Sequence, residues 1–312
     1  MSGPRRVPLR CEVGGVALWT PGLRLVWREA DPGDAPLGRD AILARLRAMD
    51  DHAPRDCAGA MLAAQPCGEQ LPALARAGTR ILYASRRQPR HLVELCIGRA
   101  AWQARLGAST RATIVRKLRK FAAASGGLID WRSYRGEAEI EVFWRLARDV
   151  SARSWQARRL DAGLPGGTEF LAGLRARARR DAVRGYLLFL GAQPVAYTLC
   201  PVDDGILRYA HVGFDPAAAA LSPGAVLQWK VLGALLDEGC HRLFDFTPGD
   251  GQHKRIFATR SVDCADVMLL RASPAALAVV GAQRGCDIAS AAGAAVLARM
   301  GVLARMRALL RR

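Results

Sequence analysis

The sequence lacks the cysteine spacing that a zinc finger or a disulfide framework requires. Its eight cysteines are scattered along 312 residues, no two of them form a CxxC pair, and no histidine stands at finger spacing. These absences exclude the common structural zinc sites and give no sign of a small disulfide-stapled fold. Dispersed, unpaired cysteines are typical of a reducing compartment, so the sequence predicts a metal-free cytoplasmic protein.

Long hydrophobic runs are also missing. No stretch reaches 18 uncharged apolar residues, and the longest candidate, residues 272–283, is too short to cross a bilayer. The basic N-terminus, with Arg5, Arg6 and Arg10, is not followed by the apolar segment of a signal peptide. The sequence therefore predicts neither a membrane span nor an exported precursor.

Acidic residues are scarce relative to basic ones. The chain carries 46 Lys and Arg, nearly all of them Arg, against 28 Asp and Glu, which gives a net charge of +18. Such a field attracts nucleotides, phosphorylated carriers, nucleic acids or acidic membranes, although Arg and Ala richness also follows from a GC-rich genome. Because the basic residues are dispersed and no helix-turn-helix, finger or aromatic RNA-binding motif is present, nucleic acid is not the expected partner.

The hydrophobic pattern predicts a mixed α/β (α+β) architecture, and 51% apolar residues supply a sizeable core. Three strands, at 186–190, 195–200 and 206–212, are joined by short turns and therefore predict an antiparallel meander. A helix at 225–238, ended by Gly239, and a strand at 242–246 follow. Further helices are predicted at 40–49, 99–124, 137–151 and 170–180, and further strands within 11–28 and at 79–84, 91–97, 128–134 and 267–271.

These elements predict three domains: a small αβ unit at 1–100, a main domain at 101–272 and a basic helical tail at 273–312. In the tail, from Ser290 onward, apolar residues recur at helical spacing among five arginines. That pattern is typical of a terminal helix packed on its own domain, and also of a helix that lies on an anionic membrane surface.

The segment 185–254 is the most informative part of the chain. A helix entered through Ser222, Pro223 and Gly224 leaves free backbone N–H groups at its start, and these favour an anion such as a pyrophosphate. Because this helix separates the strands 206–212 and 242–246, those strands can pair in parallel. If they splay apart beside the helix start, the extended amide chain of pantetheine can lie between them. The alternative is an ordinary Ser-Pro-Gly helix start.

Four blocks between residues 90 and 271 carry a family resemblance. The first is the basic helix at 109–120, and the second is Ser154-Trp155-Gln156. The third comprises residues 186–197, 213–216 and 221–224. The fourth comprises residues 244–246, Gly249-Asp250 and Lys254. In order and spacing these blocks resemble the GNAT-fold acetyltransferases of the CelD/BcsL type, which are similar to the Fem-type aminoacyltransferases. The family loop commonly has an aromatic residue where this chain has His253, and the N-terminal part matches poorly.

The resemblance implies a GNAT-like mixed, mostly antiparallel sheet flanked by helices, in a tandem arrangement with a degenerate first half at 1–100. It also implies transfer of an acyl group from acetyl-CoA or another acyl-CoA to an amine, often in polysaccharide or cell-envelope metabolism. The acceptor is then an amine-bearing small molecule or saccharide.

Amide formation from a thioester needs a neutral amine and a donor to the developing oxyanion. His253 or His211 could act as the base, and strand alternation puts Tyr209 on the same face as His211. Asp250 could orient Lys254 or polarise the acceptor amine, although aspartates at such a turn also cap backbone groups. Alternatively, His253 is an ordinary surface loop residue and His211 an ordinary core residue. The basic run around Arg116 could likewise be a solvated helix face.

The predicted site therefore has three groups and no metal. The predicted catalytic residues are His253, His211, Asp250 and Tyr209. The predicted acyl-CoA contacts are Val212, Ser222, Pro223, Gly224, Ala225, Val226 and Lys254. The predicted acceptor contacts are Arg116, Lys117, Trp155 and Asp245. Two alternatives stay open: a Fem-type transferase that takes aminoacyl-tRNA, and a non-enzymatic basic nucleic-acid-binding protein.

Overall fold

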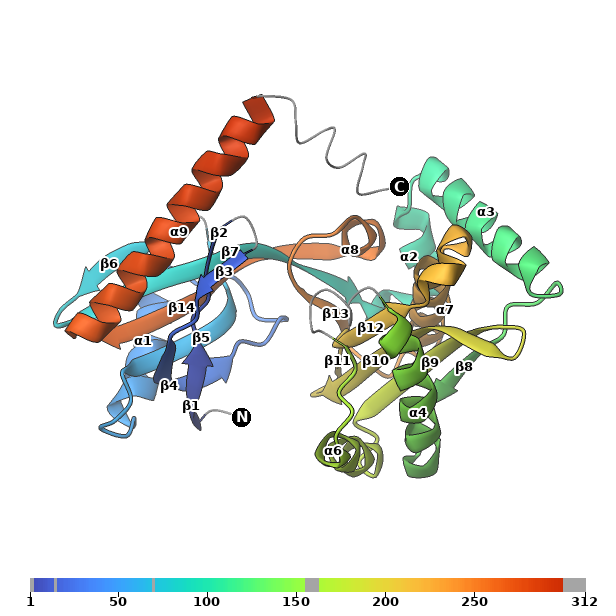
Figure 1. Ribbon diagram of the computed structural model, residues 1–312, viewed down its shortest axis with the longest axis horizontal. Coiled ribbons are helices and arrows are strands. Elements are labelled where there is room, and N and C mark those ends of the chain that lie inside the picture. Colours follow the sequence, from blue (N-terminus) through green and yellow to red (C-terminus); the bar gives the residue numbers. More distant parts are fainter. Residues whose placement is uncertain (1–2, 14–15, 69–70, 155–162, 300–312) are drawn as a thin grey trace. The chain divides into compact units, whose positions relative to one another are not determined.

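The computed structural model describes residues 3–13, 16–68, 71–154 and 163–299, and the chain forms two compact units (Figure 1). Unit 1 comprises Met1–Arg87 and Asp263–Arg312, and unit 2 comprises Gln88–Val262. Unit 1 draws on both ends of the chain because a late strand pairs with an N-terminal one. The three-domain division at residues 100 and 272 stays a prediction.

Unit 1 is built on a sheet with the strand order β1, β4, β5, β14, β7. The β1–β4 and β5–β14 pairs are antiparallel, β4–β5 is parallel, and β6 pairs antiparallel with β7. The strands of unit 1 are β1 (Gly3–Pro8), β4 (Gly22–Glu29), β5 (Gly59–Pro66), β6 (Leu74–Ala77), the parts of β7 (Arg80–Glu94) and β14 (Arg260–Arg271) that fall in this unit, and a separate hairpin of β2 (Cys11–Val13) and β3 (Val16–Trp19).

Each face of the unit 1 sheet is buried under one helix. On one face, Ile42 and Leu46 of α1 (Arg39–Asp51) pack in a cluster with strand residues such as Leu62. On the other face, Val279 and Val280 of α9 (Pro274–Arg299) join a second cluster. Within the described residues, no helix is both long enough and apolar enough to cross a bilayer. Residues 300–312 of the predicted basic tail lie outside the described part of the chain.

Unit 2 contains the predicted meander. Its sheet runs from the end of β7 through β13, β11, β10 and β9 to β8, and β12 also pairs with β10. The β11–β13 pair is parallel, and the pairs made by β8, β9, β10 and β12 are antiparallel. The strands are β8 (Trp131–Tyr134), β9 (Val183–Leu190), β10 (Gln193–Asp203), β11 (Ile206–Arg208), β12 (His211–Phe214) and β13 (Leu243–Pro248).

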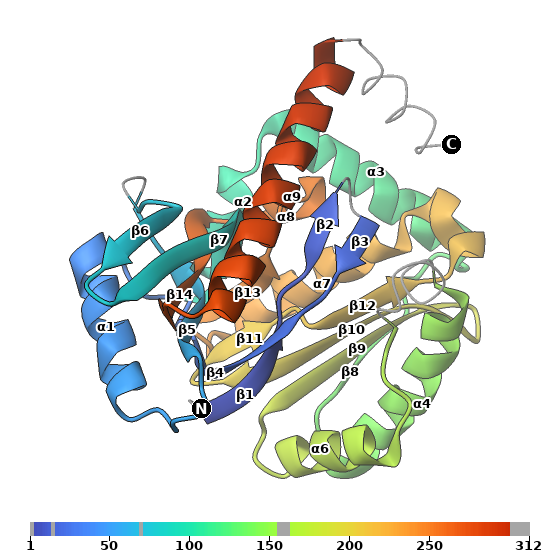
Figure 2. The ribbon, with the colours of Figure 1, turned by 60° about the vertical axis from the view of Figure 1, so that its left-hand side comes forward.

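Helices cover both faces of the unit 2 sheet. They are α2 (Gly98–Arg105), α3 (Ala108–Ala124), α4 (Glu137–Arg153), α6 (Thr168–Ala178), α7 (Pro223–Glu238) and α8 (Gln252–Phe257), with short 3₁₀ turns η1 (Leu95–Ile97) and η2 (Pro216–Leu221). Alternate residues of β9 serve the two faces: Tyr186 and Leu188 pack with α7, whereas Leu187 and Phe189 pack with α4 and α6. The helices α4 and α6 contact each other (Figure 2).

The predicted mixed, mostly antiparallel sheet flanked by helices is confirmed. Several boundaries were wrong. The strands predicted at 79–84 and 91–97, with a basic turn predicted between them at 86–90, form one strand, β7, which ends at Glu94. The strand continues through the predicted turn with Arg86 in the left-handed region, at φ 48°. The basic helical region predicted at 99–124 consists of two helices, α2 and α3, with a break at Leu106 and Gly107, and the second begins at Ala108, just before the predicted caps Ser109 and Thr110.

Candidate functional site

The centre of the candidate site is the place where β11 and β13 part. The two strands pair in parallel from Ile206 to Arg208, and the last bond between them runs from the Tyr209 N–H to the Asp245 carbonyl at 2.9 Å. The next amide, of Ala210, donates instead to Leu199 of β10 at 3.3 Å, and β12 continues along β10. The predicted parallel pairing followed by a splay is therefore present.

A cavity of about 240 Å³ lies beside this splay, and we call it the slot. Aromatic and apolar side chains dominate its wall, with a few polar groups among them, which is the usual make-up of a small-molecule site. The slot is lined by Tyr197, Thr198, Tyr209, Val212, Gly213, Phe214, Gly224, Ala225, Leu227, Gln228, His253 and Phe257.

The start of α7 contributes to the slot as predicted, but with fewer free amides. Ser222 adopts a left-handed conformation with φ 53° and joins η2 to α7. Its carbonyl accepts the N–H groups of Ala225 at 3.1 Å and Val226 at 3.2 Å, so the helix itself uses both. Among the described residues, the Gly224 N–H has no hydrogen-bond acceptor. Of the free N–H groups predicted at the start of this helix, those of Ala225 and Val226 are therefore not free, and the N–H of Gly224 stays available to an anion.

Tyr209 and His253 face the slot together. Their ring centroids are 6.2 Å apart, and Tyr209 also packs against Phe244 and Phe246. Burial raises the pKa of Tyr209 strongly, so the phenol stays protonated at neutral pH. Although His253 is exposed as a whole, the surrounding protein desolvates its ring, and this effect, followed by the charges of Lys254 and His91, lowers its pKa. The slot thus holds a neutral imidazole and a phenolic O–H donor.

His211 does not join them. Its ring packs edge-on against Phe170 at 5.5 Å and lines a different hollow under α6. The expected alternation between Tyr209 and His211 fails because the chain leaves β11 after Arg208 and enters β12 only at His211. The irregular step at residues 209–210 puts His211 away from the slot. The structure thus corrects the prediction that His211 and Tyr209 share one face.

The loop after β13 is held by its own polar groups. The Lys254 ammonium donates to the carbonyls of Thr247 at 3.1 Å and Pro248 at 3.5 Å, instead of pairing with Asp250. Asp250 lies 3.1 Å from Nε2 of His91 and 3.0 Å from Nε of Arg255. We therefore regard Lys254 and Asp250 as residues that shape the loop presenting His253, since neither lines the slot.

Asp245 is part of the core rather than of a substrate surface. Its carboxylate and the Arg90 guanidinium are both 0% exposed, and they form a two-point ion pair, with Nε of Arg90 3.0 Å from Oδ1. The same Oδ1 accepts the N–H of Thr247 at 2.9 Å. A side chain enclosed and bonded in this way cannot meet an acceptor, so we exclude Asp245 from the proposed site.

The remaining predicted acceptor contacts lie on α3 or outside the residues that the structure describes. Arg116 is exposed and Lys117 half-buried on α3, which is tied to η2 by the Lys120 ammonium bonded to the carbonyl of Ala220 at 2.9 Å. Their role in binding an acceptor stays a prediction. Trp155 lies outside the described residues.

Sequence reasoning missed some lining residues that carry usable signals. Gly213 is needed because a β-carbon there would lie 2.6 Å from Cε1 of Tyr197. Gln228 is the one polar residue among the buried residues of α7, and it follows Gly224 by four residues. That spacing puts both residues on one side of α7, so the sequence pattern could have indicated a lining role.

One group of possible metal ligands exists among the described residues, at the end of α7. Ligand atoms of Glu238, Cys240 and His241 all lie within 4.8 Å of one another. However, burial raises the pKa of Cys240 and lowers the pKa of His241, and the positive charge of the Arg184 guanidinium acts on both groups. A bound cation would meet that positive charge, so we assign no metal here.

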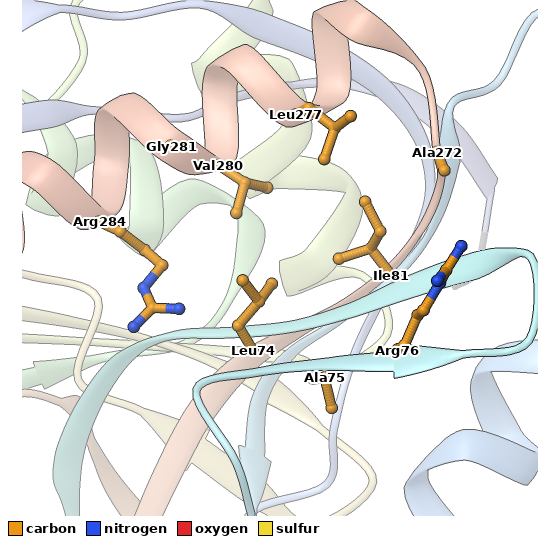
Figure 3. A pocket seen from close by; sticks show the side chains of 9 residues that line it. All are labelled: Leu74, Ala75, Arg76, Ile81, Ala272, Leu277, Val280, Gly281 and Arg284. Carbon is orange, nitrogen blue, oxygen red and sulfur yellow. The ribbon is translucent and has the colours of Figure 1, made fainter.

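A larger groove lies in unit 1, between the β6–β7 hairpin and α9 (Figure 3). Its volume is about 620 Å³, and aliphatic side chains such as Leu74, Ile81, Leu277 and Val280 line it together with Arg76 and Arg284. Among the described residues, its lining has no histidine, cysteine, carboxylate or hydroxyl that could serve as base or nucleophile. Size alone therefore does not make this groove the reaction site.

Residues 108–255 match the family model of the acetyltransferase (GNAT) domain, and this range contains both strands of the splay, the start of α7 and His253. No curated protein matches the chain.

Solved structures resemble the chain at low identity. The C-terminal domain of a putative lysylphosphatidylglycerol synthetase from Agrobacterium fabrum is 14% identical, with 83% of this chain and 77% of that chain covered and a TM-score of 0.49. FemX is 9% identical, with 86% of this chain and 88% of the FemX chain covered and a TM-score of 0.49. L-PGS from Bacillus licheniformis is 12% identical, with 79% and 77% covered and a TM-score of 0.46. At these values the likenesses say nothing about substrate.

Proposed function

We propose that the protein is an N-acyltransferase that moves an acyl group, acetyl in the simplest case, from an acyl-CoA thioester to an amine. The observation that carries this proposal is the slot: two parallel strands part after Tyr209, and Gly224, whose N–H has no acceptor among the described residues, lines the same cavity. An extended pantetheine arm fits between parted strands, and a helix start favours the diphosphate that precedes the arm. The family match over residues 108–255 agrees with this reaction class.

In the proposed reaction, His253 accepts a proton from the amine, and the amine nitrogen attacks the thioester carbonyl carbon. The C–N bond forms as the carbonyl electron pair moves to oxygen. The tetrahedral intermediate then collapses, the C–S bond breaks, and sulfur leaves with the electron pair. Tyr209, held protonated by burial, donates the proton that the sulfur takes up. The imidazolium of His253, whose ring centroid lies 6.2 Å from that of Tyr209, then returns its proton to the tyrosinate through water, so both groups regain their starting states. The products are an amide and the free thiol.

Acyl-CoA is expected to stabilise the folded protein. A ligand that binds only the folded state adds about 2.7 kcal/mol to the free energy of unfolding at a hundredfold excess over its Kd. The melting temperature should therefore rise with acetyl-CoA concentration, measured by differential scanning fluorimetry. If acetyl-, propionyl- and longer acyl-CoAs at millimolar concentration all leave the melting temperature unchanged, the proposal fails.

Two substitutions at Gly224 separate charge from bulk at the start of α7. Gly224→Asp puts a carboxylate beside the proposed diphosphate and should abolish the acyl-CoA shift. Gly224→Ala should keep the shift, because a β-carbon there would have its nearest neighbour, Cδ1 of Phe214, at an ordinary 3.8 Å. Calorimetric titration of both variants with CoA tests this. Equal CoA binding by Gly224→Asp and wild type would move the diphosphate elsewhere.

The acceptor in this proposal is an amine-bearing small molecule or saccharide of cell-envelope or polysaccharide metabolism, as the CelD/BcsL resemblance implies. Residues 1–100 would be a degenerate first half of a tandem fold, and the tail would lie on its own domain or on anionic membrane. The competing donor is aminoacyl-tRNA. Retention of charged tRNA at physiological salt, with no response to acyl-CoA, would favour that donor over CoA.

A further inference from the structure

Gln228 is the one polar residue on the buried face of α7. Its neighbours on that face are Pro223, Val226, Leu227, Val231, Leu232, Gly233, Leu235 and Leu236. The Gln228 side chain is only 2% exposed, and within the described residues neither its Oε1 nor its Nε2 has a hydrogen-bond partner. A buried carboxamide that leaves both halves unpaired destabilises the fold, so its presence indicates a partner that arrives from outside.

The position of Gln228 indicates where that partner lies. Gln228 lines the slot and follows Gly224 by four residues, so both residues are on one side of α7. At 1.5 Å per residue, Gln228 sits about 6 Å further along the helix than the end that faces the proposed diphosphate. The portion of an acyl donor that reaches Gln228 is therefore the arm between its diphosphate and its thioester.

The chemistry of a carboxamide narrows the partner further. Gln228 offers one carbonyl acceptor and one NH₂ donor. A phosphate or a thioester carbonyl can pair only with the donor, and an ammonium only with the acceptor. A secondary amide carries an N–H and a carbonyl side by side and can satisfy both halves. The pantetheine arm contains two such amides, whereas the ester link of an aminoacyl-tRNA contains none.

We propose that Gln228 is a binding subsite for a secondary amide of the donor's pantetheine arm, carried either by CoA or by an acyl carrier protein. This inference rests on the proposed function and adds to it. It requires the side chain to turn its carboxamide toward the arm when the donor enters. Gln228 then positions the arm, and Tyr209 and His253 perform the chemistry.

The test compares wild type with Gln228→Met, which keeps the length and volume of the side chain and removes its amide. We expect CoA to bind about tenfold more weakly to the variant, the loss of a pair of hydrogen bonds to a ligand. The 3′-phosphoadenosine 5′-diphosphate half of CoA, which lacks the arm, should bind equally to both proteins. Both affinities are measured by isothermal titration calorimetry.

A second readout separates ligand binding from a structural role. Because the variant no longer buries an unpaired amide, its ligand-free melting temperature should rise by about 1–3 °C. A structural glutamine would give the opposite sign, a lower melting temperature. Gln193→Met, at an exposed position of β10, serves as the matched control and should change neither quantity. Gln228→Glu, whose carboxylate form accepts but cannot donate, should also weaken CoA binding when measured at alkaline pH, where the carboxyl is ionised.

The possible outcomes test the Gln228 subsite separately from the proposed acyltransferase function. If wild type binds CoA and Gln228→Met binds it equally well, the subsite is wrong and the proposed function stands. If wild type binds neither CoA nor a phosphopantetheinylated carrier protein, both ideas fall. Preference for the carrier over free CoA, with the same tenfold loss in the variant, identifies the carrier as the source of the arm.

Discussion

Replacing His253 with glutamine is expected to lower kcat/KM for amine acylation by about 10²–10⁴-fold, the usual contribution of a general base. Glutamine keeps a polar side chain of similar reach but cannot take up the proton. The slot would still bind the donor, because the free N–H of Gly224 and the parted strands are unchanged. The rate is measured by thiol release from acetyl-CoA, and donor affinity by calorimetry should stay near the wild-type value.

The role of His253 as a base also predicts how kcat/KM changes with pH. Only neutral imidazole can act as base, and the pKa of His253 is lowered by desolvation and by the charges of Lys254 and His91. The neutral form therefore persists below pH 6.5, the ordinary value for histidine. We expect kcat/KM to hold as the pH falls to 6.5 and to drop only below it. The variant should lack this acid limb.

His211→Gln is the matched control, since His211 lies in the separate hollow beside Phe170. It should retain most of the wild-type kcat/KM and its acid limb. The assignment of His253 is refuted if His253→Gln is as active as wild type, or if His211→Gln alone loses the acid limb.

Asp245→Asn is expected to lower the free energy of unfolding by about 3–5 kcal/mol, the cost of removing one partner from a buried ion pair. Both Asp245 and Arg90 are 0% exposed, so the substitution leaves the Arg90 guanidinium enclosed without its counter-charge. The amide also presents one acceptor oxygen where the carboxylate uses two for Arg90. Urea denaturation monitored by circular dichroism gives the change.

Two further variants serve as controls for the predicted effect of Asp245→Asn on stability. Asp250→Asn, at an exposed position of the same loop, should alter the unfolding midpoint little, because exposed ion pairs are screened by water. The double variant Arg90→Met with Asp245→Leu should recover much of the lost stability, since it removes both charges together. If Asp245→Asn is as stable as wild type, Asp245 returns to the list of candidate acceptor contacts.

Local sequence was sufficient for the parts of the site that depend on short-range geometry. The turns of the meander, the helix entered through Pro223 and Gly224, and the helix end at Gly239 follow from backbone preferences of single residues. The parallel pairing of β11 with β13 follows from the helix between them. These rules placed Gly224, Ala225, Val212, Tyr209 and His253, and all five line one cavity.

Other elements could not be predicted from the sequence, because the local conformational preferences of their residues differ from the structure that tertiary packing imposes. The strand β5, residues Gly59–Pro66, has the composition GAMLAAQP, in which alanine gives no strand signal. It becomes a strand because it is buried between β4 and β14, where pairing outweighs propensity. The pattern at 86–90 predicts a turn, yet β7 continues through this segment with only Arg86 in the left-handed region.

The sequence by itself therefore determined the order of strands in the meander, the start of α7 and the residue types that we propose bind a diphosphate and move a proton. Only the tertiary structure decided that His211 lies outside the slot, that Asp245 is buried with Arg90, and that Gln228 is buried with no hydrogen-bond partner in the described part of the chain. The physical reason is that conformational preferences act over a few neighbouring residues, whereas burial and charge pairing depend on residues far away in the chain. Arg90 and Asp245, 155 residues apart, meet only when β7 pairs with β13.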